Sequence, residues 1–182
     1  MSNNYFKIAV LPGDGIGPEI ISESIKILDV IAEAFQYKFH FDYGLIGAEA
    51  IFKTGNPLPE ETLKICKESD AVLFGAIGDP VFDNNPDAKV RPEQGLLKLR
   101  KELGLFANIR PLKTYASLIE KSPLKREIIE GADIQIFREL VSGIYFGEKF
   151  TDPDGGYAYD VCKYSREDII PIAHMAFQEA QK

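Results

Sequence analysis

Three arginines stand where an α/β protein would bind a small anion. Arg100 lies within a predicted helix, Arg110 ends a predicted strand before a proline, and Arg138 ends another strand. Because α/β sheets bind ligands at the ends of their strands, the three guanidinium groups are placed to converge at one side of a sheet. A guanidinium fork matches a carboxylate bidentately, so the trio suits a small substrate with two carboxylates. Taken singly, each arginine is more simply a surface ion-pair partner.

A tyrosine between two glycines is a candidate proton donor. Tyr145 stands in Gly-Ile-Tyr-Phe-Gly, residues 143–147. The flanking glycines let backbone approach closely and leave the phenol a clear reach, and a suitably placed tyrosine can act as a general acid. The plainer interpretation is a strand tyrosine that packs against its neighbours.

A glycine-rich turn, Gly-Asp-Gly-Ile-Gly-Pro at residues 13–18, separates a predicted strand from a predicted helix. A dinucleotide fingerprint needs glycine at its first, third and sixth places, and the sixth place here is Pro18. No acidic residue closes the following strand, which ends at Tyr43 and Gly44. As a bare pattern, the segment favours a structural turn over a phosphate loop.

Strands and helices alternate along the chain, which indicates an α/β architecture. Apolar runs and period-two alternation predict strands, while apolar residues at three- and four-residue steps predict helices whose inward stripes include Phe35 and Phe177. The predicted strands are residues 5–11, 39–43, 71–75, 106–110 and 133–139, with Pro111 closing the fourth. The predicted helices are residues 19–36, 46–53, 60–68, 94–103 and 123–130, the last capped by Ser122.

Three segments depart from this alternation. Residues 79–92 combine prolines, asparagines and aspartates without apolar periodicity, which predicts a surface loop. Residues 145–150 and 157–164 flank a turn-rich tip and predict a protruding hairpin. Ser165 caps a final predicted helix, in which Pro171 is expected to delay or bend the start.

The composition limits the class of protein. The 182 residues carry a formal net charge of −7 and a pI near 5.0, which argues against a nucleic-acid partner. No apolar run approaches the ~20 residues of a membrane span, and the N-terminus lacks the pattern of a signal peptide, so no membrane association and a cytoplasmic location are expected. Cys66 and Cys162 form no metal-ligand pattern and are expected to be buried or half-buried free thiols.

Four segments together resemble the successive blocks of the β-decarboxylating dehydrogenases, the isocitrate/isopropylmalate dehydrogenase family. They are residues 11–19, 92–100, 105–111 and 137–148, and the resemblance runs in order over essentially the whole chain. Within the family the chain is most similar to the isopropylmalate branch, which serves leucine biosynthesis and uses NAD with Mg²⁺ or Mn²⁺. The resemblance implies an α/β, non-Rossmann fold with a parallel or mixed sheet and flanking helices.

The resemblance also implies roles for particular residues. Arg100, Arg110 and Arg138 are expected to bind the malate carboxylates, and Tyr145 is expected to be the catalytic acid. Residues around the isopropyl group would be Glu93, Leu96 and Leu97. Cofactor contacts would come from Ile16, Gly75, Ala76, Ile77, Gly78 and Glu93. The chain departs from the usual family pattern at Asp79, Val81, Val141 and Ser142.

Family members are about twice this long, so the resemblance implies a truncated, N-terminal half. Residues 1–108 would begin the cofactor-side domain, and residues 109–182 would begin the dimerisation domain, with an arm hairpin near 145–164. The base lysine, the metal-binding aspartates and the adenine-binding segment are expected elsewhere, so no metal ligand is expected here and the half is expected to be inactive alone. Its partner would be a second copy, as in a homodimer, or a complementing C-terminal half.

Two alternatives remain open at this stage. One is a non-catalytic remnant or subunit-interaction module. The other is a related 2-hydroxy diacid dehydrogenase, acting on tartrate or homoisocitrate.

Overall fold

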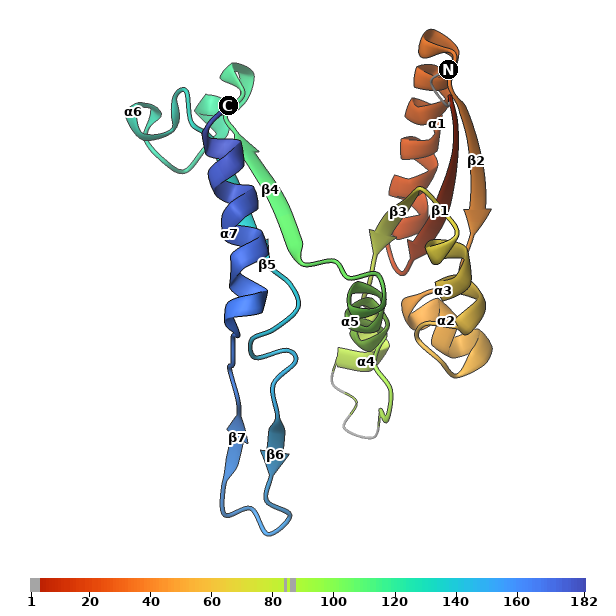
Figure 1. The fold of residues 1–182 in the computed structure, drawn as a ribbon, viewed down its shortest axis with the longest axis vertical. Coiled ribbons are helices and arrows are strands. Elements are labelled where there is room, and N and C mark those ends of the chain that lie inside the picture. Colours follow the sequence, from red (N-terminus) through yellow and green to blue (C-terminus); the bar gives the residue numbers. More distant parts are fainter. Residues whose placement is uncertain (1–3, 84, 86–87) are drawn as a thin grey trace. The chain divides into compact units, whose positions relative to one another are not determined.

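The apolar run near the start of the chain forms β1 (Tyr5–Gly13), the central strand of a parallel sheet with the order β2-β1-β3. Its partners are β2 (Lys38–Tyr43) and β3 (Ala71–Ala76). This sheet belongs to the first of two units, which are unit 1 (Met1–Leu103) and unit 2 (Gly104–Lys182) (Figure 1). The structure is a computed structural model that describes residues 4–83, 85 and 88–182. A central parallel strand is covered on both faces, as the predicted continuous apolar run requires.

Helices cover both faces of the unit 1 sheet. The first, α1 (Gly17–Phe35), contacts all three strands, while α2 (Gly47–Thr54), α3 (Glu60–Lys67) and α5 (Pro92–Glu102) contribute to or adjoin the main core. That core combines strand, helix and loop residues: Ala9, Leu11, Ile46, Leu58, Leu63, Cys66 and Leu99. Strand alternation directs Val10 to the opposite face, where it is also fully buried. The unit is therefore a layered α/β sheet with helices on both sides.

Unit 2 is built around an antiparallel pair, β4 (Ala107–Lys113) and β5 (Asp133–Glu139). The connection between them contains a 3₁₀ helix, η1 (Ala116–Lys121), and a short helix, α6 (Arg126–Ile129). A second antiparallel pair, β6 (Lys149–Thr151) and β7 (Ala158–Asp160), forms a hairpin.

The closing helix of unit 2 is α7 (Arg166–Ala180), which packs against β5 (Figure 1). Among the described residues of this unit, the buried apolar side chains are Ile119, Leu140 and Ile172. Apolar side chains on both strands of the larger pair remain about half exposed, as at Leu112 and Ile134. Unit 2 consequently buries much less apolar surface than unit 1.

The strand and helix predictions are confirmed in unit 1, with small shifts of their ends. In the predicted loop of residues 79–92, however, a short helix forms, α4 (Pro80–Asp83). Asp79 caps it, because the Asp79 carboxylate accepts a hydrogen bond from the Val81 amide at 2.9 Å. Residues 84, 86 and 87 of that loop lie outside the described residues.

Two predictions about element ends in unit 2, at Pro111 and at Ser122, were wrong. Pro111 does not end β4, which continues to Lys113, because an edge strand tolerates proline where the N–H would point away from its partner. Ser122 does not cap a helix over residues 123–130. Its hydroxyl instead accepts a hydrogen bond from the Leu124 amide at 3.1 Å, a local turn that uses up the capping group, and only the four residues of α6 become helical.

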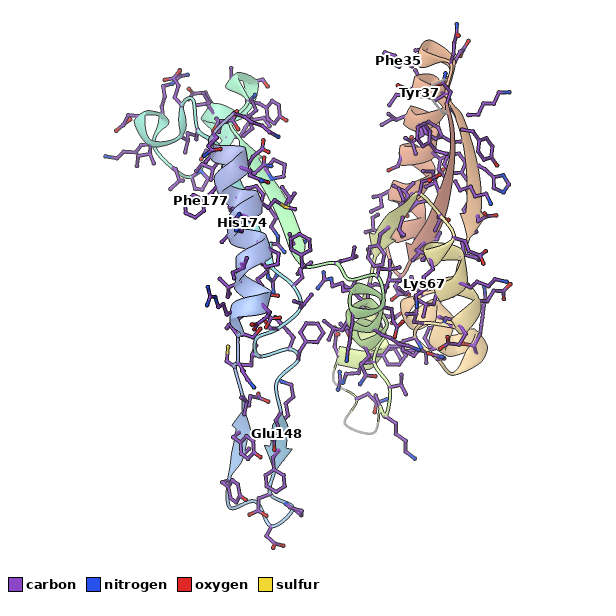
Figure 2. The ribbon with its side chains drawn as sticks, viewed as in Figure 1. Phe35, Tyr37, Lys67, Glu148, His174 and Phe177 are labelled. Carbon is purple, nitrogen blue, oxygen red and sulfur yellow. The ribbon has the colours of Figure 1, made fainter. Side chains whose placement is uncertain are left out.

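Other predictions were wrong about exposure or extent. The predicted inward residues Phe35 and Phe177 are 65% and 73% exposed, and Figure 2 shows Phe35 beside Tyr37, with ring centroids 6.2 Å apart. Cys66 is buried as expected, but Cys162 is exposed. The hairpin strands are shorter than predicted and exclude Tyr145, which lies in a turn.

The final helix begins where predicted. The Ser165 hydroxyl accepts a hydrogen bond from the Asp168 amide at 3.1 Å, and the Asp168 carboxylate accepts one from the Ser165 amide at 2.9 Å. This reciprocal cap fixes the start of α7, so Pro171 lies inside the helix and does not delay it. None of the described helices combines the length and hydropathy needed to cross a membrane.

Candidate functional site

Two of the three arginines lie on one face of the β4-β5 pair in unit 2. Arg138 stands directly opposite Asn108 in the antiparallel register, and Arg110 lies two residues beyond Asn108 on the same strand. Side chains directly opposite each other, and those two residues apart, share a face of a sheet. The Arg110 Nε donates a hydrogen bond to the Asn108 Oδ1 at 2.7 Å, which orients its guanidinium. Both arginine side chains are exposed.

Tyr145 joins this cluster from the turn that follows β5. The Arg138 guanidinium carbon lies 5.8 Å from the centroid of the Tyr145 ring, a cation–π contact that restrains both side chains. Tyr145 is 60% exposed, so its phenol is accessible to a ligand. The structure thus brings two guanidinium groups and one phenol together within a single unit.

The turn that carries Tyr145 is fixed by its backbone. Gly143, at φ +79°, receives a hydrogen bond on its carbonyl from the Gly147 amide at 3.0 Å and donates its own amide to the Lys163 carbonyl at 2.9 Å. A Cβ at Gly143 would meet the Tyr164 hydroxyl at 2.6 Å, so this position has no room for a side chain. The neighbouring Cys162, followed by desolvation, raises the pKa of the Tyr164 phenol, which favours the neutral hydroxyl that packs here.

Val141 and Ser142, where the chain departs from the family pattern, are held by the residue after Arg138. The Glu139 carboxylate accepts hydrogen bonds from the amide of Val141 and from the amide of Ser142, the latter at 3.3 Å. These two hydrogen bonds use backbone amides, which any residue other than proline supplies. Valine at position 141 and serine at position 142 are therefore compatible with this turn.

A second set of predicted residues shares one face of α5 in unit 1. Glu93, Leu96, Leu97 and Arg100 follow the i, i+3, i+4, i+7 spacing of a single helical face. The opposite face is anchored in the core by Leu99, which is 3% exposed. Leu96, Leu97 and Arg100 are half-buried and Glu93 is exposed, so this face combines apolar surface with one charge of each sign.

The predicted cofactor segments lie at the carboxyl edge of the unit 1 sheet. Ile16 is 56% exposed at the start of α1, and the segment of Gly75, Ala76, Ile77 and Gly78 ends β3 and leaves the sheet. A Cβ at Gly78, where φ is +129°, would lie 3.8 Å from the Glu93 Oε1. The start of α5 and the end of β3 are therefore close neighbours. A cavity of about 430 Å³ opens at this edge, lined in part by Gly13, Gly15, Glu49 and Asp79.

A buried carboxylate that the sequence did not single out connects the loops at this edge. Asp14 is 5% exposed, and its carboxylate accepts hydrogen bonds from the amides of Ala48 at 2.9 Å, Glu49 at 3.0 Å and Gly78 at 3.1 Å. Its own amide donates to the Ala76 carbonyl at 2.8 Å. The glycine-rich turn is thus a structural turn, and an acidic residue between its glycines was the available signal for this role.

The predicted site residues fall into two groups. Arg110, Arg138 and Tyr145 lie together in unit 2, and Asn108 and Glu139, both missed in the sequence, support them. The cofactor segments, the α5 face and Arg100 belong to unit 1. Convergence of all three arginines stays a prediction. Across residues 4–83, 85 and 88–182, no group of three or more His, Cys, Asp or Glu side chains is arranged to hold a metal ion.

Comparison with known proteins gives consistent matches. The sequence profile described as isocitrate/isopropylmalate dehydrogenase matches residues 7–182. A 3-isopropylmalate dehydrogenase of Bacteroides fragilis (strain YCH46) is 55% identical over 177 residues, which is 97% of this chain and 50% of that protein. The 3-isopropylmalate dehydrogenase of Aquifex aeolicus is 53% identical over 180 residues, 97% of this chain and 49% of that protein. The chain spans about half the length of the curated relatives it matches.

Solved structures agree with the sequence matches. The apo crystal structure of a β-decarboxylating dehydrogenase from Thermococcus kodakarensis matches with a TM-score of 0.66 at 35% identity, covering 97% of this chain and 46% of that one. An isocitrate dehydrogenase from Methylococcus capsulatus matches with a TM-score of 0.76 at 26% identity, covering 97% of this chain and 48% of that one. The α/β fold, with its parallel sheet and flanking helices, is the one these proteins share.

Proposed function

The chain belongs to the isocitrate/isopropylmalate dehydrogenase family, and we propose that it supplies the substrate-binding half of an enzyme that oxidises and decarboxylates 3-isopropylmalate with NAD, in leucine biosynthesis. The observation that carries this proposal is the unit 2 cluster, in which Arg110 and Arg138 share a sheet face and Tyr145 lies against Arg138. The half-length chain is proposed to be inactive alone. The rest of the enzyme would come from a complementing C-terminal half or a longer chain.

The cluster suits a substrate with two carboxylates. Each guanidinium can hold one carboxylate through two hydrogen bonds, and the Asn108 contact already orients Arg110. NAD, when bound, would supply the acceptor for a hydride from the hydroxyl-bearing carbon. The hydroxyl proton leaves to a base outside this chain. The carbon–carbon bond to the neighbouring carboxylate then breaks and carbon dioxide departs. The electron pair of the broken bond stays on the substrate, which becomes an enolate.

The enolate carbon must then gain a proton, and Tyr145 is proposed to donate it. The phenol is exposed and lies in the same cluster as the carboxylate-binding arginines, so a substrate held there has a proton donor beside it.

The α5 face supports the choice of an apolar substrate substituent. Leu96 and Leu97 are half-buried and present apolar surface between Glu93 and Arg100. A substrate with an additional carboxylate at that position would leave this charge facing leucines, without a partner, which is costly. An isopropyl group buries its methyl groups there instead. The arginine of this face, Arg100, is proposed to join the other two on the malate carboxylates.

The carboxyl edge of the unit 1 sheet fits part of a dinucleotide. Gly15 and Gly78 adopt positive φ values, and a Cβ at Gly15 would lie 3.9 Å from the Gly78 carbonyl oxygen, so two backbone segments run close together without side chains between them. Ile16 offers an exposed apolar surface beside them. The carboxylates of Glu49 and Asp79 line the nearby cavity and oppose a pyrophosphate. We propose that this edge holds the nicotinamide side of NAD through Ile16, Gly75, Ala76, Ile77, Gly78 and Glu93.

The described residues do not fit a divalent cation, since none of them form a cluster of ligands. We therefore assign no step to Mg²⁺ or Mn²⁺ in this chain and propose that the ligands lie in the complementing part.

The hairpin of unit 2 is proposed to be an arm that pairs with a second subunit. Its register sets Phe150 opposite Tyr159, whose rings lie 5.7 Å apart, and Lys149 opposite Asp160 in an ion pair of 3.0 Å. These contacts give the exposed hairpin its own internal support. The same feature favours a second candidate function, a non-catalytic module that binds intact subunits.

The experiment that tests the enzyme proposal is complementation. The chain is co-expressed with the C-terminal half of the Bacteroides fragilis relative, and NADH formation is followed with 3-isopropylmalate and Mg²⁺ or Mn²⁺. We expect turnover by the pair and none by either half. Arg138→Lys, which keeps the charge but loses the planar fork, should lower turnover by roughly 10²-fold or more, while Arg126→Lys, a change at an arginine paired with Glu120 and Glu130, should not. A purified pair without NADH formation would refute the proposal.

The other candidates are separated by two further measurements. Isocitrate, tartrate and homoisocitrate replace the substrate in the same assay, and Leu96→Gln should impair only the use of 3-isopropylmalate. An equal loss on all four substrates would remove the basis for that substrate. A non-catalytic module would instead co-purify with full-length subunits and add no turnover.

A further inference from the structure

We propose that Asp14 is a positioning residue that sets the geometry of the cofactor-binding edge in unit 1. This inference rests on the proposed function, because it concerns the same edge of the sheet. Asp14 would touch neither the substrate nor the cofactor. It would act through the Gly78 amide, which its carboxylate holds, and through the loop that carries Ile16.

The contacts of Asp14 join three separate connections. The residue itself lies between β1 and α1, its carboxylate binds the amides of Ala48 and Glu49 at the start of α2, and it also binds the amide of Gly78 after β3. The bound amides are 34, 35 and 64 residues away in sequence. One side chain thus fixes all three loops that leave the carboxyl edge of this sheet.

The chemistry requires a carboxylate at this position. Three amide donors converge on two oxygens, Oδ2 accepting from Ala48 and Gly78 and Oδ1 from Glu49. Both oxygens of an ionised carboxylate accept, whereas an asparagine side chain offers one oxygen and a second group that only donates. Asparagine at position 14 must therefore turn an NH₂ group toward at least one amide N–H. Asp14 is 5% exposed, and the amide that loses its acceptor there loses a hydrogen bond to a charged group.

The Gly78 backbone is held by its hydrogen bond to Asp14 in a conformation that favours glycine. At φ +129°, Gly78 occupies backbone space that other residues rarely adopt, and a Cβ there would meet no heavy atom closer than 3.8 Å. The residues before Gly78 are held in other ways, because Ile77 packs against the core and the Ala76 carbonyl accepts a hydrogen bond from the Asp14 amide at 2.8 Å. At Gly78 itself, the backbone amide is tied to the glycine-rich turn by its hydrogen bond to the Asp14 carboxylate.

A control residue with a similar environment is available. Thr62 is 2% exposed, and its hydroxyl donates to the Leu45 carbonyl at 2.8 Å in the connection that leads to α2. Thr62→Val keeps the side-chain shape and removes a partly buried hydrogen bond to the connection between β2 and α2. It does not touch the Gly78 loop.

The test uses the full 182-residue chain with NADH as the probe. Amide exchange and NADH titration are followed by NMR in the wild type, Asp14→Asn, Thr62→Val and Gly78→Ala. We expect exchange at Gly78 to accelerate at least tenfold in Asp14→Asn relative to Thr62→Val, and the NADH dissociation constant to rise at least tenfold. Gly78→Ala strains the backbone of the same loop while leaving the Asp14 carboxylate in place, and it should weaken NADH binding by a similar factor. It also keeps the inference testable where Asp14→Asn does not fold.

The outcomes separate the two proposals. Faster exchange at Gly78 in Asp14→Asn with unchanged NADH affinity would overturn the positioning role and leave the proposed function standing. Normal affinity in Gly78→Ala would overturn the positioning role and also remove Gly78 from the proposed cofactor contacts. Equal losses of affinity in Asp14→Asn and Thr62→Val would reduce Asp14 to a general stabilising residue and overturn the inference. If NADH shifts the amide NMR signals of neither Ile16 nor Gly78 in the wild type, the proposed cofactor role of this edge is refuted. The inference about Asp14 is then refuted as well.

Discussion

Two glycines at the ends of α2 allow the contribution of the Asp14 carboxylate to the stability of unit 1 to be tested. Gly47 begins the helix at φ +77°, and Gly55 follows its end at φ +73°. A Cβ at Gly47 would collide with the Asp14 Oδ2 and would lie 2.7 Å from the Ile77 Cδ1, whereas a Cβ at Gly55 would meet nothing within 4 Å. Replacing each glycine with alanine therefore imposes a similar backbone penalty, and only Gly47→Ala also forces the Asp14 carboxylate and the end of the Ile77 side chain to move.

The expected magnitudes follow from these contacts. A left-handed backbone costs an L-residue about 1–2 kcal/mol, which is the whole effect expected for Gly55→Ala. A hydrogen bond to a charged group contributes about 1.5–3 kcal/mol, so breaking the bonds from Ala48 and Glu49 to Asp14 adds about 3 kcal/mol even after partial relaxation. Gly47→Ala should therefore lower the free energy of unfolding of unit 1 by about 4–5 kcal/mol.

The assay is urea unfolding of the two variants, followed through amide signals of β1 so that only unit 1 is measured. At a slope of about 1–3 kcal/mol per molar urea, the midpoints of the two variants should differ by about 1 M or more. Midpoints that agree within error would refute the reasoning, because they would mean that the Asp14 carboxylate adds nothing to the stability of this edge.

Three further predictions concern the core, the last helix and the thiols. Leu11→Ala, which empties a fully buried position in β1, should destabilise unit 1 by about 2–5 kcal/mol in the same urea assay, and Ile27→Ala, at a 62% exposed position, should cost far less. The backbone amide of Ser165, followed by its side chain, lowers the pKa of Asp168, so this carboxylate should stabilise the start of α7 at neutral pH and lose that effect as the pH falls through its lowered pKa. An NMR titration should show this pKa rising only part of the way toward its ordinary value in Ser165→Ala, because that variant keeps the backbone amide. Burial raises the pKa of the Cys66 thiol, so a thiol reagent at neutral pH should modify the exposed Cys162 first and reach Cys66 only when unit 1 opens. Mass spectrometry of the labelled peptides can test this order.

The sequence predicted the elements whose signals are local. The apolar run through Val10 and Leu11 identified a buried strand, and Ser165 identified the start of the last helix, because alternation and capping act over a few residues. The errors arose where a local signal had competing uses. Ser122 formed a turn with Leu124 in place of a helix cap, and Pro111 fitted an edge strand.

The candidate site was predictable in its residue types but not in its supports. Arg110, Arg138 and Tyr145 were visible as arginines at strand ends and a tyrosine between glycines. The place of Asp14 between glycines marked the residue but not its partners, because these are backbone amides, which any residue can supply, and they lie far along the chain. Pairings of that kind depend on the three-dimensional path of the loops.

The central place of β1 also constrains how the protein folds as it is synthesised. β1 is made before its two partners, which begin at Lys38 and Ala71, so the sheet cannot close until β3, which ends at Ala76, has left the ribosome. Until then α1 and β2 can form, but β1 lacks one of its two parallel neighbours, and such non-local pairing is slow. Unit 1 should therefore depend on chaperones during synthesis, and a ribosome stalled before residue 71 should present β1 in a protease-sensitive state.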